Sequence, residues 1–109
     1  MEPIKDMDEL YILTSDWHYE RKITVNGRAE TQLMKLVEEL GEVAAAMARN
    51  NKEGVKDGIG DMLVVMVALA ELSGTSLLQC WEIAYEEIKD RKGTLLPNGN
   101  FVKEADYAN

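Results

Sequence analysis

Residues 35–48 read KLVEELGEVAAAMA, and this stretch carries three different helix faces within four turns. At about 100° per residue, apolar side chains recur along one side at helical spacing, which predicts a face that packs in a core. The members of this row are Leu33, Leu36, Val37, Leu40, Val43, Ala44 and Met47. A strip of small residues beside it (Gly41, Ala45 and Ala48) predicts the close approach of a neighbouring helix. The remaining sector holds Glu38, Glu39 and Glu42, with Lys35 one turn earlier.

Two further acids lie in a second apolar stretch. Residues 55–72 read VKDGIGDMLVVMVALAEL, and the run from Met62 to Ala70 predicts a helix that is buried all round. Asp57 and Asp61 are four residues apart, so they share one face at its head, where a carboxylate without a partner is costly to bury. A solvated acidic face would explain the three glutamates alone. All five acids together favour a divalent, oxygen-preferring cation such as Mg²⁺ between the two helices, because Lys35 can pair with one acid only.

These residues carry a resemblance to a known family. Lys35, Glu38, Glu39, Leu40 and Glu42, followed by Asp57 and Gly60-Asp61, resemble the MazG-like, all-α nucleoside triphosphate pyrophosphohydrolases, whose signature is Glu-x-x-Glu followed by Glu-x-x-Asp. The likeness extends to Trp17 and Arg21 upstream and to Lys89, Arg91 and Phe101-Val102-Lys103 downstream, and it is nearest to the small phage-type members. One position departs from the signature: the first acid of the second pair falls on Gly58, so Asp57 stands in for it.

The resemblance implies hydrolysis of a nucleoside triphosphate between the α and β phosphates, giving the monophosphate and pyrophosphate. Glu39, Glu42 and Asp61, with Asp57 in support, would hold one or more Mg²⁺ ions, with Mn²⁺ as the alternative metal. The ions would neutralise phosphate charge and activate the water that attacks the α-phosphorus. Glu38 is the candidate base, or a group that orients that water. For Lys35 the resemblance implies a role in balancing the acids or in contacting phosphate.

Two other groups of residues are candidates for substrate binding. Trp17 and Arg21 fit the rim of a nucleotide pocket, since an indole stacks on any base and an arginine recognises phosphate; a core anchor is the alternative for Trp17. Lys89, Arg91 and Lys92 belong to the basic cluster of an acidic chain, and the resemblance implies that they hold the triphosphate. Cations near a helix C-terminus also favour the helix dipole without any ligand.

Composition excludes several classes of function. Twenty acids against twelve bases give 109 residues a net charge of −8, which opposes binding to nucleic acid or to an anionic membrane. The start MEPIKDMDEL lacks the pattern of a signal peptide, and Cys80, the single cysteine, allows no internal disulfide. We therefore expect a cytoplasmic protein with one domain over residues 1–109.

The periodicity predicts an all-α fold. We expect helices over residues 7–21, 28–49 and 55–72 and a fourth that begins at Ser76, with Asp6 or Asp8 capping the first. A small hairpin is expected within residues 95–102. Short links between the helices suggest an antiparallel four-helix bundle, and the excess of apolar surface suggests that a homodimer or homotetramer completes it.

Two alternatives to an enzyme stay open. A helical interaction module would use the acids for solubility only and would show no dependence on metal. A regulator that binds polyphosphate would bind Mg²⁺ and nucleotide without releasing pyrophosphate. The sequence does not identify the preferred base or sugar.

Overall fold

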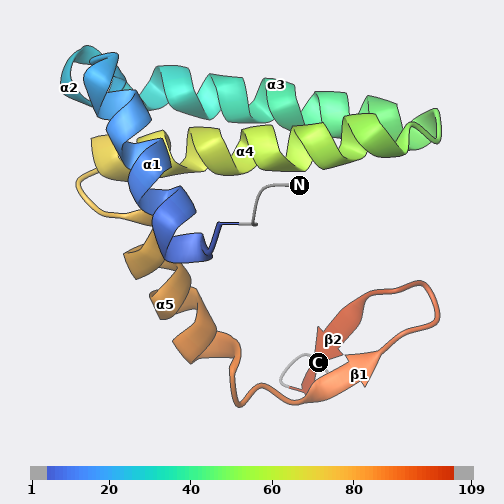
Figure 1. Ribbon diagram of the computed structural model, residues 1–109. Coiled ribbons are helices and arrows are strands. Elements are labelled where there is room, and N and C mark those ends of the chain that lie inside the picture. Colours follow the sequence, from blue (N-terminus) through green and yellow to red (C-terminus); the bar gives the residue numbers. More distant parts are fainter. Residues whose placement is uncertain (1–4, 105–109) are drawn as a thin grey trace. The chain divides into compact units, whose positions relative to one another are not determined.

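The computed structural model describes residues 5–104, which divide into two compact units: residues up to Leu77 and residues from Leu78 onward. The described residues form five helices and two strands (Figure 1). The helices are α1 (Met7–Glu20), α2 (Ile23–Asn26), α3 (Ala29–Ala48), α4 (Lys52–Leu72) and α5 (Leu77–Ile88), and the strands are β1 (Gly93–Leu95) and β2 (Phe101–Lys103). The predicted all-α class is confirmed, and the four-residue α2 is the helix that the sequence did not predict within this range.

Local chemistry fixes the helix ends. The Asp6 carboxylate accepts a hydrogen bond from the Glu9 N–H at 2.8 Å and caps α1, as one of the two predicted alternatives required. Between α3 and α4, Asn50 adopts a left-handed φ of 56°, and the Asn51 side chain then accepts from the Gly54 N–H at 3.0 Å. This turn reverses the chain within three residues. Gly74, with a left-handed φ of +82°, follows the end of α4.

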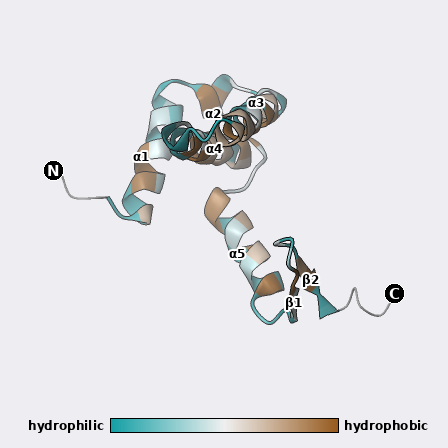
Figure 2. Ribbon diagram, turned by 90° about the vertical axis from the view of Figure 1, so that its right-hand side faces the viewer, coloured by the Kyte–Doolittle hydropathy of each residue, from teal (hydrophilic) through white to brown (hydrophobic). Residues whose placement is uncertain are grey.

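The two long helices α3 and α4 run antiparallel and side by side over their whole length (Figure 1), and Figure 2 views this hairpin along its axis. Their contact holds most of the small core. The buried apolar residues within the described range are Val43, Ala46, Val65, Val67, Ala68 and Ala70. Ala68 is completely buried, but no large described side chain is, so a single chain has a core of small residues only.

Two predictions about burial are wrong for the single chain. The second apolar helix is not buried all round, because Ile59 and Leu63 on α4 are each 52% exposed. In the strip of small residues on α3, a neighbouring helix does not come close at Gly41, where a Cβ would meet no atom within 4 Å, whereas Ala45 is half-buried. The physical reason is that α3 packs on α4 along the row of Val43 and Ala46, which leaves Gly41, Ile59 and Leu63 to one side of the contact.

The second unit contains most of α5 and an antiparallel hairpin. Strand β1 pairs with β2 in the register Gly93↔Lys103 and Leu95↔Phe101, and the chain turns through Gly99, whose φ is +92°. A Cβ on Gly93 would collide with the Val102 carbonyl and the Phe101 ring, so glycine is required where the strands meet. The predicted hairpin is confirmed.

The length and composition of the helices bear on whether they could span a membrane. Among residues 5–104 no single helix is long and apolar enough to cross a bilayer, and α4 and α5 reach the required length and composition only when they are counted together.

Candidate functional site

The line of contact between α3 and α4 sets the geometry of the site. On α3 it contains Gln32, Leu36, Glu39, Val43 and Ala46, which are the buried or half-buried residues at spacings of three and four. On α4 it passes through Gly58, where a Cβ would collide with the Val43 side chain. Val43 therefore lies opposite Gly58, and only a residue without a side chain allows the two helices to come this close.

Four acids precede this contact line by one residue on each helix. Glu38 and Glu42 come directly before Glu39 and Val43 on α3, while Asp57 comes directly before Gly58 on α4 and Asp61 follows one turn later. A shift of one residue rotates a side chain by about 100°, and in an antiparallel pair the same shift turns both rows toward the same side. Glu38, Glu42, Asp57 and Asp61 thus share one side of the hairpin, called here the acid face.

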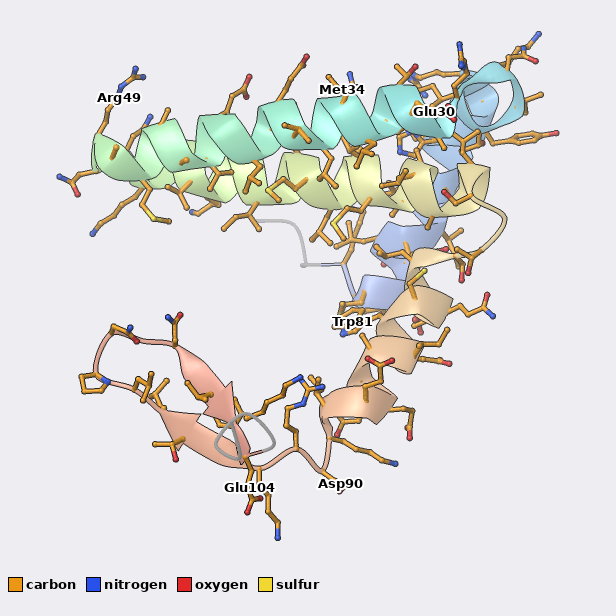
Figure 3. The ribbon with its side chains drawn as sticks, turned by 180° about the vertical axis from the view of Figure 1, so that it is seen from behind. Glu30, Met34, Arg49, Trp81, Asp90 and Glu104 are labelled. Atoms are coloured by element: carbon orange, nitrogen blue, oxygen red, sulfur yellow. The ribbon has the colours of Figure 1, made fainter. Side chains whose placement is uncertain are left out.

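An open hollow confirms that three of these acids lie together. Its volume is about 300 Å³, and Glu42, Asp57 and Asp61 line it together with Arg49 and Asn51 at the end of the hairpin. Figure 3 places Arg49 at the C-terminal end of α3. The sequence did not indicate Arg49 or Asn51 as members of the site, because their role depends on the turn that brings α4 back along α3. The doublet Asn50-Asn51 at the break between two helical patterns was the available signal.

Glu39 is the acid with the most unusual environment among the described residues. It is half-buried at the edge of the contact line, and its Oε2 atom is enclosed without a hydrogen-bond partner. Partial burial raises the pKa of the Glu39 carboxyl group, and the charges of Glu42 and Asp61 and a hydrogen bond with Glu42 raise it further, while Lys35 lowers it. Glu39, Glu42 and Asp61 therefore interact electrostatically, with Lys35 close enough to oppose them.

The donor set fits a hard divalent cation in its chemistry. Carboxylate oxygens are the ligands that Mg²⁺ prefers, and the enclosed Oε2 of Glu39 is an acceptor that lacks a partner. Within residues 5–104, however, no three His, Cys, Asp or Glu side chains converge as they would around a metal ion. Glu42, Asp57 and Asp61 are exposed, so rotation about their side-chain bonds is not blocked by packing.

Helix α1 is fixed to the same side of α4 that carries the acids. The buried His18 ring bonds through Nε2 to the Val64 carbonyl oxygen at 2.8 Å, and the Ser15 hydroxyl donates to the Glu71 carboxylate at 2.6 Å. Val64 follows Asp61 by three residues, so α1 crosses α4 about one turn from that acid. A sequence pattern does not show this contact of His18, because its partner is a backbone atom 46 residues away.

Trp17 and Arg21 form a stacked pair on the exposed side of α1. The Arg21 guanidinium lies 4.1 Å from the centre of the Trp17 ring and donates to the Trp17 carbonyl oxygen at 3.2 Å. Trp17 is 45% exposed, so the alternative that it anchors the core is wrong. Its stacking with Arg21 leaves a large aromatic surface in solvent.

The predicted phosphate-binding bases belong to the second unit. Lys89 pairs with Glu86 at 2.7 Å, and Arg91 and Lys92 follow the end of α5 as exposed residues. Each unit is described by itself, so the role of these three bases in the site stays a prediction.

Comparison with known proteins gives two matches. The MazG nucleotide pyrophosphohydrolase domain family matches residues 28–92, which include α3, α4, α5, the acid face and Glu39. A protein of Haemophilus phage HP1 (strain HP1c1), described as an uncharacterized 18.2 kDa protein in the rep-hol intergenic region, is 36% identical over 66 residues. The match covers 61% of this chain and 40% of the phage protein, so the chain spans less than half of that relative. The comparison with solved structures gives no match.

Proposed function

Because the chain belongs to the MazG nucleotide pyrophosphohydrolase domain family, we propose that it hydrolyses a (deoxy)nucleoside triphosphate between the α and β phosphates in a reaction that requires Mg²⁺. The products would be the nucleoside monophosphate and pyrophosphate. The observation that carries the proposal is Glu39: a half-buried carboxyl group with an enclosed, unpartnered oxygen, next to Glu42 and Asp61. Such an arrangement is unfavourable for a scaffold and suits a site that binds a cation.

Four carboxylates would hold the metal: Glu39, Glu42 and Asp61, with Asp57 from the same hollow in support. When bound, the ion would supply neutralisation of phosphate charge and activation of the attacking water, and Mn²⁺ is the alternative metal. Glu38 lies on the acid face one residue before Glu39 and is the proposed base, which accepts a proton from that water. Lys35 opposes the negative charge at Glu39 and would keep the cluster from excess repulsion.

Trp17 and Arg21 are proposed to bind the base and sugar end of the substrate. Arg21 holds the indole ring through the cation–π contact, and α1 is tied by His18 to the side of α4 that carries Asp61. An exposed aromatic ring stacks on any base, so a preference for one base would have to come from other groups. Lys89, Arg91 and Lys92 are proposed to contact the triphosphate through charge-assisted hydrogen bonds. A homodimer or homotetramer in the cytoplasm, acting in control of the nucleotide pool, is the proposed setting.

The decisive experiment measures pyrophosphate release from a panel of canonical and modified deoxynucleoside triphosphates, in Mg²⁺ and in chelator. The proposal expects pyrophosphate and monophosphate as the only products with at least one substrate, and no release in chelator. Release of orthophosphate instead would contradict cleavage between the α and β phosphates.

The non-catalytic alternatives give different results in the same assay. An interaction module binds neither nucleotide nor metal, and a polyphosphate-binding regulator binds both without pyrophosphate release. Equilibrium binding of a non-hydrolysable triphosphate analogue, measured with and without Mg²⁺, separates these two hypotheses if no turnover is found.

A further inference from the structure

The hollow between α3 and α4 contains a charged group to which the metal site gives no role. Arg49 is the base among the residues that line it, and it shares the hollow with the carboxylates of Glu42, Asp57 and Asp61. Arg49 follows Glu42 by seven residues, so the two side chains leave α3 on the same side, about 10 Å apart along the helix axis. A guanidinium group therefore lies at the end of the hollow that is nearest to the turn between the helices (Figure 3).

Arg49 is not a counter-ion of these acids. Within residues 5–104 its guanidinium group makes no ion pair and no hydrogen bond, although three carboxylates line the same hollow. Its backbone N–H closes α3 through hydrogen bonds to the Ala45 and Ala46 carbonyl oxygens at 3.2 Å. The side chain is exposed, so packing does not prevent it from turning toward a ligand. The guanidinium group is thus free to bind an anion, which its planar set of N–H donors suits.

The first unit sets α1, the acids and Arg49 in order along the hairpin. Val43 lies opposite Gly58, and the acids of the hollow cluster around this crossing. Val64, which holds His18 of α1, follows Gly58 by six residues, and Arg49 follows Val43 by six residues. Because the helices are antiparallel, these two steps lead in opposite directions along the axis, by about 9 Å each. Figure 1 shows the same order, with α1 near one end of the hairpin and the α3–α4 turn at the other.

We propose that Arg49 binds the β and γ phosphates of the substrate and so fixes the direction in which the nucleotide lies along the hairpin. The inference rests on the proposed function, in which Trp17 and Arg21 on α1 bind the base and the carboxylates hold the metal near the α-phosphorus. A nucleoside triphosphate is a linear molecule. With its base at α1 and its α-phosphate at the acids in the middle, its last two phosphates extend toward the hairpin turn, where Arg49 lies.

This position gives Arg49 a role in the reaction itself. Attack of water on the α-phosphorus breaks the bond between that phosphorus and the oxygen that bridges it to the β-phosphorus. The bridging oxygen leaves as part of pyrophosphate and keeps the electron pair of the bond, while the proton of the water passes to Glu38. Negative charge thus grows on the group that Arg49 contacts, and a positioned guanidinium group stabilises it through paired hydrogen bonds. In a chain with a net charge of −8, such a local cation also offsets the repulsion of a polyphosphate.

Inorganic pyrophosphate is the probe for this site, because it is the part of the substrate that Arg49 is proposed to bind. Isothermal titration calorimetry of the full chain in excess Mg²⁺ should give Arg49→Gln a dissociation constant about 10-fold or more above that of the wild type. Lys52→Gln is the matched control: it removes the same charge at the same end of the hairpin, from an exposed residue that does not line the hollow. Its dissociation constant should stay within about 2-fold of the wild type at physiological salt.

Two results of this titration would overturn the inference. Equal pyrophosphate affinity of Arg49→Gln and the wild type, including no binding by either, would mean that Arg49 does not contact the phosphates. Equal losses in Arg49→Gln and Lys52→Gln would mean that general charge attracts the anion, without a contact at Arg49. Circular dichroism should show both variants folded like the wild type, because both side chains are exposed.

Deoxyadenosine monophosphate tests the direction of binding, because it carries the base, the sugar and one phosphate. Arg49→Gln should leave its affinity unchanged within about 2-fold, since Arg49 is proposed to contact the phosphates that this nucleotide lacks. A loss as large as that for pyrophosphate would place Arg49 at the nucleoside end of the substrate and overturn the inference.

Turnover distinguishes a failure of this inference from a failure of the proposed function. A wild type that releases pyrophosphate, together with an Arg49→Gln variant that binds pyrophosphate equally well, would keep the function and overturn the role of Arg49. A wild type that binds pyrophosphate through Arg49 but cleaves none of the triphosphates would overturn the function and retain Arg49 as the residue that binds pyrophosphate.

Discussion

The two sides of the α3–α4 hairpin carry opposite kinds of side chain on one backbone. The acid face has Glu38, Glu42, Asp57 and Asp61. The opposite side has half-exposed aliphatic residues one or two positions away in the sequence: Val37, Leu40, Ile59 and Leu63. On both helices the acids come one residue before the contact line, and the aliphatic residues come one residue after it. The two sides can therefore be tested by separate substitutions, since a change on one side leaves the side chains of the other in place.

The largest effect is expected at Glu39, on the contact line beside the acid face: Glu39→Gln should lower kcat/KM for pyrophosphate release by about 100-fold or more. The amide keeps the shape of the side chain and loses the charge that holds a cation, so helicity by circular dichroism should not change. Glu53→Gln is the control, because Glu53 is an exposed acid on α4 that does not line the hollow. Full activity of Glu39→Gln would remove Glu39 from the site.

The contact line between the two faces is tested at Gly58. Gly58→Ala should lower the free energy of unfolding by about 1–3 kcal/mol, because the new Cβ collides with Val43. Gly60→Ala is a matched control two residues along the helix, where a Cβ meets no atom within 4 Å; it should stabilise the protein by about 0.5–1 kcal/mol. Denaturant titration measures both.

A compensating change sharpens this test. In the Val43→Ala background the cost of Gly58→Ala should largely disappear, because the colliding methyl groups are absent. An equal cost in both backgrounds would contradict the register that places the four acids on one face.

A smaller effect is expected at Asp57, which is proposed to take the place of the family's glutamate at Gly58. Asp57→Asn should raise the Mg²⁺ concentration for half-maximal activity by about 3- to 10-fold, since one of several carboxylates around the hollow is lost. Asp61→Asn should have a larger effect on the same quantity, and Asp16→Asn on α1 should have none. If Asp57→Asn equals the wild type in a Mg²⁺ titration, Asp57 only favours the N-terminal part of α4 through the helix dipole.

The smallest effect concerns the metal-free protein, where Glu42→Gln should raise the melting temperature at neutral pH by a few degrees. The raised pKa of Glu39 means that the folded state holds its proton more tightly than the unfolded chain does. Proton binding at Glu39 therefore stabilises the folded state at low pH, and this stabilisation is lost as the pH rises above about 4.3, the ordinary pKa of glutamate. Removing the charge of Glu42 relieves part of that loss. The gain in melting temperature should therefore shrink as the pH falls toward about 4.3.

Excess Mg²⁺ should reverse the order of the two melting temperatures. A ligand at about 100 times its dissociation constant stabilises the folded state by about 2.7 kcal/mol, and the wild type has one more carboxylate to bind it. Melting curves in chelator and in Mg²⁺ that coincide for both proteins would contradict a metal site on the acid face.

Several features follow from the sequence because they depend on neighbouring residues along the chain. Helical periodicity predicts the two long helices to within a few residues, and the turn residues within 95–102 predict the hairpin that β1 and β2 form. The acid pattern on two successive helices predicts the family, which the match over residues 28–92 confirms. These features depend on local spacing and backbone conformation, which the sequence displays directly.

Other features were decided only by the tertiary structure. The sequence grouped Leu33, Leu36, Val37 and Val43 in one core-facing row, but contact with α4 divides that row into a buried line and an exposed apolar face. The choice depends on Gly58, which admits Val43 and thereby fixes the rotation of each helix about its own axis. An amphipathic pattern limits which sides of a helix can be buried. Close packing of Val43 on Gly58 selects one of them, and helical periodicity does not show which residues of the two helices will meet.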